Sequence, residues 1–201
     1  MRKRVLVFPC GSEIGLEIYN SVKDSIHFEL FGLSSTNDHG KFVYPNYIEG
    51  IGFYTDPSFI SDLKLIISKY GIDIIYPTMD SIISHLKYYE LELGIPVVGP
   101  SYDLAKICSS KIETYNKLKG KIKIPKLFFK NDQELKFPLF VKPDVGYGSR
   151  NISKINNADQ LKNINLDGMI LCEYLPGKEF TIDCFTDLNG DLISASIRLV
   201  H

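Results

Sequence analysis

Residues 137–150, FPLFVKPDVGYGSR, determine how the rest of the chain is interpreted. The first part is an apolar run that ends in Lys142, a pattern typical of a buried strand with a cation at its end. The second part is a loop that contains Gly146, Gly148, Ser149 and Arg150. Glycines allow backbone N–H groups to approach phosphate oxygens, and lysine adds a point charge. The segment predicts either a polyphosphate-binding loop or an ordinary surface β-turn. It is not a P-loop, because the Gly-x-x-x-x-Gly-Lys-Ser/Thr pattern is absent.

Two further blocks have chemistry that fits a nucleotide. Residues 172–181, CEYLPGKEFT, turn from an apolar strand into a bend that is followed by a carboxylate. Backbone groups at such a bend can hydrogen-bond an adenine edge, and a later carboxylate can accept from ribose hydroxyls. Residues 109–115, SSKIETY, place Lys111 at the start of a helix, where bound anions are favoured. Taken singly, the first block is better explained as a strand–loop–strand connection with solvated charges, and the second as a solvated helix lysine.

The chain before residue 100 alternates strands and helices. Short apolar runs predict strands at 4–8, 27–33, 72–76 and 96–99, and amphipathic spacing predicts helices at 14–23, 58–70 and 81–93. Such alternation indicates an α/β fold with a parallel sheet covered by helices on both faces. The stretch after residue 40 is predicted to be irregular.

The first strand–helix turn does not carry a dinucleotide fingerprint. With Gly15 aligned to the last glycine of that pattern, Cys10 and Ser12 stand at the other two positions, and no carboxylate ends the second strand. Gly11 and Gly15 instead predict a tight turn and a close contact between helix and strand. The sequence therefore disfavours a nicotinamide-dependent oxidoreductase.

The second half is predicted to be α+β with antiparallel pairing. Helices are expected at 102–119 and 158–164, and strands at 126–129, 137–143, 152–155, 169–175, 180–187 and 191–199, with a hairpin turn at 188–190.

Composition excludes several classes of partner. The 201 residues have a net charge of −1, so no general basic surface for nucleic acid or an anionic membrane is expected. The four cysteines and four histidines are scattered without metal-ligand spacing, so no metal ligands are assigned. The apolar run near the N-terminus is stopped by Pro9 and is too short for a signal peptide or a membrane span. We therefore expect reduced thiols and a cytoplasmic location.

In this order, the blocks resemble the ATP-grasp superfamily, in particular the N-terminal portion of carboxylate–amine ligases similar to the carbamoyl-phosphate synthase large subunit and biotin carboxylase. The resemblance implies a Rossmann-like preceding domain at 1–100, a connecting helix and loop at 101–125, a lid subdomain at 126–175, and at 176–201 the first hairpin of an incomplete catalytic subdomain. It also implies an ATP-binding protein that activates a small carboxylate as an acylphosphate, which an amine or similar nucleophile attacks.

The resemblance assigns roles toward ATP residue by residue. Lys111 and Lys142 would hold the α- and β-phosphates. The loop would close over the β- and γ-phosphates through Gly146, Gly148 and Ser149, with further charge from Arg150. Glu173 would offer its backbone carbonyl to the adenine amine, Leu175 its backbone N–H to the ring, and Glu179 its carboxylate to the ribose.

One part of the family pattern is missing from this sequence. The acidic residue and Glu-x-Asn that hold Mg²⁺ in the family lie downstream of the hairpin, and the sequence stops at His201. The catalytic residues are thus unknown, and the chain alone is expected to be inactive, with its Mg²⁺ ligands beyond this point. A non-catalytic nucleotide-binding or scaffold module is the alternative. The hairpin would lack packing partners, so a homodimer or disorder at this end is expected. Ser12 and Asp80 are weak candidates for the substrate side, and ordinary loop and cap residues are the better explanation of both.

Overall fold

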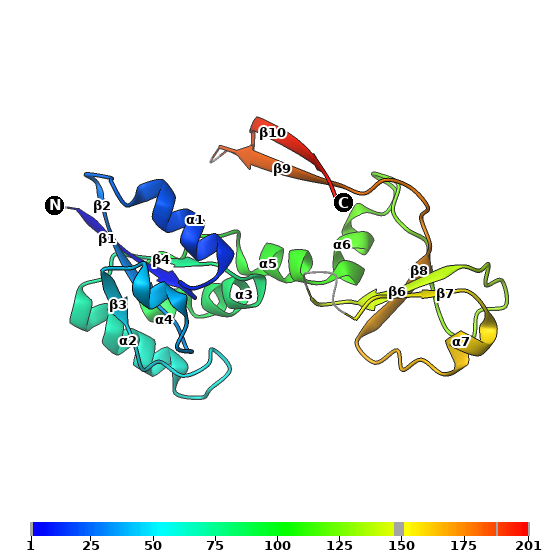
Figure 1. Ribbon diagram of the computed structural model, residues 1–201, viewed down its shortest axis with the longest axis horizontal. Coiled ribbons are helices and arrows are strands. Elements are labelled where there is room, and N and C mark those ends of the chain that lie inside the picture. The colour runs from blue at the N-terminus through cyan, green and yellow to red at the C-terminus, as the bar shows by residue number, and fades with distance from the viewer. Residues whose placement is uncertain (1, 147–150, 188, 201) are drawn as a thin grey trace. The chain divides into compact units, whose positions relative to one another are not determined.

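The first apolar run becomes the central strand of a parallel sheet in the computed structural model, which describes residues 2–146, 151–187 and 189–200. β1 (Lys3–Phe8) pairs in parallel with β2 (Phe28–Leu33) on one side and β4 (Ile74–Pro77) on the other. β3 (Asn46–Ile48) extends the sheet beyond β2, giving the order β3-β2-β1-β4 (Figure 1). The described chain divides into two compact units, Met1–Ile122 and Lys123–His201, and each is described by itself.

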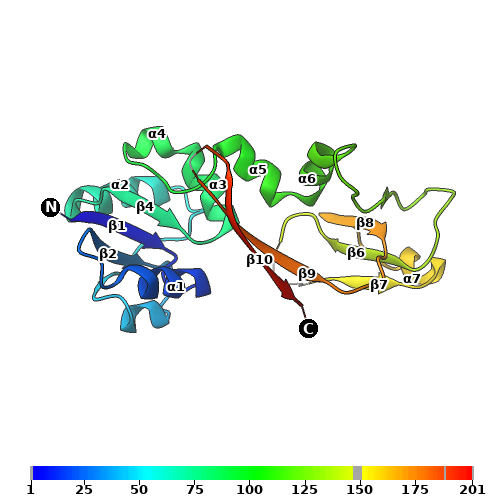
Figure 2. The same ribbon diagram turned by 90° about the horizontal axis from the view of Figure 1, so that it is seen from above.

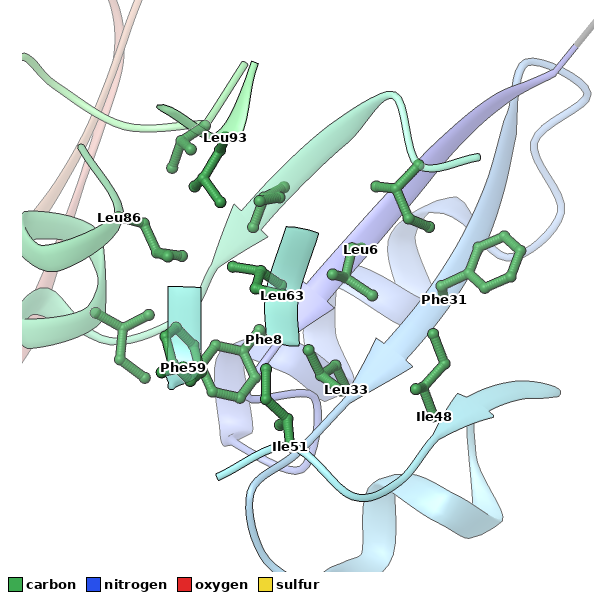
Figure 3. Close-up of a cluster of buried hydrophobic side chains, with 14 residues drawn as sticks. Leu6, Phe8, Phe31, Leu33, Ile48, Ile51, Phe59, Leu63, Leu86 and Leu93 are labelled. Carbon is green, nitrogen blue, oxygen red and sulfur yellow. The ribbon is translucent and has the colours of Figure 1, made fainter. Parts of the chain in front are cut away.

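Both faces of this parallel sheet are covered, as the uninterrupted apolar strands predict. Val5 and Val7 of β1 pack toward α1 (Glu13–Val22), whereas Leu6 and Phe8 point into a larger cluster on the opposite face. The helices on that opposite face are α2 (Phe59–Tyr70), α3 (Asp80–Tyr88) and α4 (Glu90–Leu93). Figure 3 shows their apolar side chains meeting those of the strands, among them Phe31, Leu33, Phe59, Leu63, Leu86 and Leu93. The predicted α/β fold class is confirmed.

Three local predictions in the first unit are wrong. The stretch expected to be irregular contains the 3₁₀ helix η1 (His39–Phe42), which begins where the Asp38 carboxylate accepts the Gly40 N–H, and it also contains β3. Residues 96–99 form an isolated bridge from Ile75 to Val97 and not a strand. The helix predicted at 81–93 is divided at Tyr89 between α3 and α4.

The helix predicted at 102–119 is also divided. α5 (Tyr102–Ser109) and α6 (Lys111–Leu118) are separated at Ser110, whose backbone is extended with φ −108° and ψ 126°. The Ser110 hydroxyl accepts the Glu113 N–H at 3.1 Å, which is a helix N-cap. Serine competes for backbone hydrogen bonds in this way, so it starts a second helix where the apolar spacing alone predicts continuation.

The second unit is built on an antiparallel sheet of the order β5-β8-β6-β7. Its strands are β5 (Leu127–Phe128), β6 (Leu139–Pro143), β7 (Ser153–Ile155) and β8 (Met169–Glu173). Figure 2 shows β6 between β7 and β8, with α7 (Ala158–Lys162) beside β7. A core forms on one face from Leu139, Val141, Ile155, Leu161 and Leu171.

The chain continues into an antiparallel hairpin of β9 (Phe180–Thr186) and β10 (Leu192–Leu199). The side chains of both strands are exposed, and the guanidinium of Arg198 pairs with Asp183 across the hairpin at 2.8 Å. Self-association through this hairpin stays a prediction. Across the described ranges, no helix is both long and apolar enough to cross a membrane.

Candidate functional site

The two faces of the antiparallel sheet in the second unit differ sharply. Side chains directly opposite each other on antiparallel strands share a face. The register pairs Leu139 with Glu173 and Val141 with Leu171, and these strands bury Leu139, Val141 and Leu171 in the core. The alternate residues therefore lie on the other face. The strand period of two places Phe140 and Lys142 there together.

That second face forms the wall of a pocket with a volume of about 460 Å³. This is within the size range of small-molecule sites, which is about 300–1,000 Å³. The pocket is lined by Pro125, Phe140, Lys142 and every residue from 172 to 179. One lysine at a strand end and the bend after β8 thus face the same space.

Four of the residues assigned to ATP from the sequence line this pocket. They are Lys142, Glu173, Leu175 and Glu179. Gly146 follows β6 with φ +153°, a backbone conformation that favours glycine. Gly148, Ser149 and Arg150 lie outside the described residues. Lys111 is the first residue of α6 and belongs to the other compact unit.

One lysine of the pocket wall lies beside a buried thiol. Lys142 is half-buried and lies beside the buried Cys172. Burial raises the pKa of the Cys172 thiol, and the positive charge of Lys142 opposes that rise. The thiol is therefore a neutral apolar part of the wall, and Lys142 is the cation beside it that an anionic ligand would meet.

Sequence reasoning missed two residues that line this pocket and one that lies against them. Phe140 and Tyr174 contribute aromatic walls, with ring centroids 6.4 Å apart. Lys154 of β7 lies opposite Phe140 in register, and its Nζ is 4.1 Å from the centre of the Tyr174 ring. The strand period of two could have placed Phe140 beside Lys142. No local signal identifies Lys154, because it reaches the site only through the pairing of β6 with β7.

A metal site is not formed by the part of the chain that the structure describes. Within it, no group of three or more His, Cys, Asp or Glu side chains lies close enough to hold a metal ion. The Mg²⁺ ligands are therefore not shown in this part of the chain, and their position downstream stays a prediction.

One of the two substrate candidates in the first unit, Ser12, has a structural role. The Ser12 hydroxyl caps α1 by accepting the Gly15 N–H at 3.0 Å, and it donates to Thr78 Oγ1 at 2.8 Å. Thr78 in turn donates to the Pro9 carbonyl at 2.8 Å, which joins the ends of β1 and β4. Asp80 is the first residue of α3. The Ser12 hydroxyl is engaged inside the fold.

Comparison with known proteins finds a family model that matches the second half of the chain and solved structures with a similar fold. The family model described as an ATP-grasp domain matches residues 108–196. No curated protein matches the sequence. Among solved structures, L-amino acid ligase from Bacillus licheniformis is similar with a TM-score of 0.72 at 13% identity, covering 99% of this chain and 49% of that chain.

Two further solved structures have the same fold. N5-carboxyaminoimidazole ribonucleotide synthetase from Thermotoga maritima has a TM-score of 0.72 at 20% identity, covering 96% of this chain and 51% of that chain. The biotin carboxylase domain dimer of Hydrogenobacter thermophilus 2-oxoglutarate carboxylase, in complex with MgADP, ADP and bicarbonate, has a TM-score of 0.67 at 16% identity. It covers 90% of this chain and 46% of that chain.

The chain thus spans about half the length of each of these structures. At these identities the likeness shows the fold, whereas the family match covers the segment that contains the pocket-lining residues. The resemblance predicted from the sequence is confirmed, and residues 108–196 carry the pattern of an ATP-grasp domain.

Proposed function

We propose that this chain is the ATP-binding part of a ligase that activates a small carboxylate as an acylphosphate for attack by an amine or similar nucleophile. The observation that carries the proposal is the pocket on one face of the second unit. There Lys142 and the bend at residues 173–179 line the same space. A nucleoside triphosphate needs a cation for its phosphates at one end and backbone hydrogen-bonding groups for its base at the other. This pocket has both on one wall.

Each pocket residue then has a role set by its position. The half-buried ammonium of Lys142 neutralises phosphate charge at the pocket wall. The backbone of residues 173–175 contacts the adenine edge, Phe140 and Tyr174 provide apolar surface for the base, and Glu179 accepts from the ribose. The phosphate roles of Lys111 and of the glycine loop stay predictions from the sequence. These residues act by positioning the nucleotide and neutralising its charge, which account for most of phosphoryl-transfer catalysis.

The similar structures support this chemistry at a coarse level. Two are named as a ligase and a synthetase, and the biotin carboxylase domain holds MgADP together with bicarbonate, a small carboxylate-like anion. The narrower likeness to the carbamoyl-phosphate synthase large subunit stays a prediction from the motifs. So do the cytoplasmic location, the homodimer and the absence of nucleic-acid and membrane partners.

The test is isothermal titration of ATP into the protein at its full natural length. We expect saturable binding that weakens at least tenfold in Lys142→Ala, because a charge-assisted contact to phosphate is lost. Lys136→Ala is the matched control, since this exposed lysine lies in the same unit and outside the pocket. Absence of ATP binding by a folded protein, or equal affinity in Lys142→Ala, would overturn the proposal.

A further inference from the structure

The end of β8 has an unusual hydrogen-bond arrangement with the residue opposite it. Glu173 faces Lys126, one position before the pairing of Leu127 with Cys172. The Glu173 backbone N–H donates to the Lys126 carbonyl at 2.9 Å. The Lys126 backbone N–H donates to Oε1 of the Glu173 carboxylate at 3.0 Å.

In a regular antiparallel ladder, two facing residues of this kind exchange both N–H···O=C bonds. Here one of the two bonds is formed, and the carboxylate takes the N–H that the Glu173 carbonyl would otherwise accept. Within the described residues, that carbonyl oxygen receives no ladder hydrogen bond. The preceding residue, Pro125, has no N–H to offer in its place.

The open carbonyl is at the pocket. N–H and C=O of one strand residue point to the same side of the strand, so the Glu173 carbonyl points toward residues 125 and 126. Pro125 and Glu173 both line the pocket. A ligand that enters there meets a backbone acceptor whose usual partner has been occupied by a side chain.

We propose that the Glu173 side chain is a positioning residue that keeps its own carbonyl open for the exocyclic amine of an amino-purine. The inference rests on the proposed function and deepens it. It attributes the pocket's preference for an amino-purine to the hydrogen bond between the Lys126 N–H and the Glu173 carboxylate. Removing the carboxylate would let the Lys126 N–H return to the Glu173 carbonyl. The amine would then compete with an intramolecular donor.

A purely structural role for the carboxylate predicts something different. If it only stabilises the start of β5, its loss would weaken binding of every purine nucleotide by the same factor. The ratio of affinities for a nucleotide with the amine and one without it separates the two roles. Glutamine at 173 keeps a side-chain oxygen that can accept the Lys126 N–H, so it serves as the conservative variant.

The experiment is titration of ATP and of purine riboside 5′-triphosphate, which lacks the 6-amino group, into the full-length protein and its variants. We expect the wild type and Glu173→Gln to prefer ATP by about fivefold, the worth of one neutral hydrogen bond. Glu173→Ala should bind both nucleotides with nearly equal affinity. Glu134→Ala, an exposed carboxylate outside the pocket, should keep the wild-type ratio.

Folding of each variant is checked by circular dichroism and urea unfolding before titration. An undiminished preference for ATP in Glu173→Ala, or a preference lost equally in Glu173→Gln, would overturn the inference and leave ATP binding intact. A wild type that binds both nucleotides equally would overturn it as well. A wild type that binds neither nucleotide would instead refute the proposed function.

Discussion

Gly15→Ala tests why α1 can pack so closely against the turn after β1. Gly15 is buried in the first turn of α1, and a Cβ built on it would lie 2.8 Å from the Cys10 carbonyl carbon and 3.0 Å from its Cα, with the carbonyl oxygen closer still. These are main-chain atoms, which cannot rotate aside, so α1 would have to shift. The Tyr44 hydroxyl, which donates to the Gly15 carbonyl at 2.6 Å, would have to follow.

Opposing energies determine the size of the effect. Alanine is favoured over glycine in a helix by about 1 kcal/mol. Overpacking against a rigid neighbour costs about 1–3 kcal/mol, and weakening a buried hydrogen bond adds about 1 kcal/mol. With the middle of the overpacking range, the expected net loss is about 2 kcal/mol in the free energy of unfolding.

Urea unfolding followed by far-UV circular dichroism measures this change. With a denaturant dependence of about 2 kcal/mol per molar urea, the midpoint of Gly15→Ala should fall by about 1 M. Glu17→Ala, an exposed position on the same helix, should stay within about 0.5 kcal/mol of the wild type. An unchanged or higher midpoint for Gly15→Ala would refute the close-packing argument.

Two further predictions concern the same end of the sheet. Burial raises the pKa of the Cys10 thiol from 9.0 to about 11. Folding therefore favours the neutral thiol. The contribution of this thiol to the free energy of unfolding is fully present below pH 9 and is lost as the pH rises through about 11. The wild type should lose roughly 2–3 kcal/mol more stability than Cys10→Ala over this interval in urea titrations, and equal losses would contradict the burial argument. Ser12→Ala removes both the cap of α1 and the bond to Thr78, so we expect a loss of about 1–2 kcal/mol by the same measurement, with Ser12→Asn retaining more stability than Ser12→Ala.

The layered fold could be predicted because both faces of the first sheet are buried. The apolar run at β1 and the glycine after α2 mark a strand and a helix end directly, and Gly71 indeed ends α2 with φ +59°. The break at Ser110 could not be predicted from apolar spacing, because a side-chain cap competes there with helix continuation. η1 and β3 are too short to give a periodic signal.

The candidate site was predictable to the extent that it depends on local sequence. Lys142 and the bend at 173–179 are contiguous patterns, and strand alternation extends the site to Phe140. The contact between Lys154 and Tyr174 and the bond from Lys126 to Glu173 join residues far apart in sequence. They depend on how β5, β7 and β8 are paired, which no local pattern specifies.

Amide hydrogen exchange with and without ATP tests the central claim most directly, since it locates the bound nucleotide on the chain. Saturating ATP should slow exchange of the amides of residues 173–175 and 177–179, with the largest effect at Leu175, whose N–H is proposed to donate to the adenine ring. The amides of η1 and β3 in the other unit should serve as the unaffected reference. Bound ATP that left residues 173–179 unprotected while protecting a different segment would contradict the proposed site.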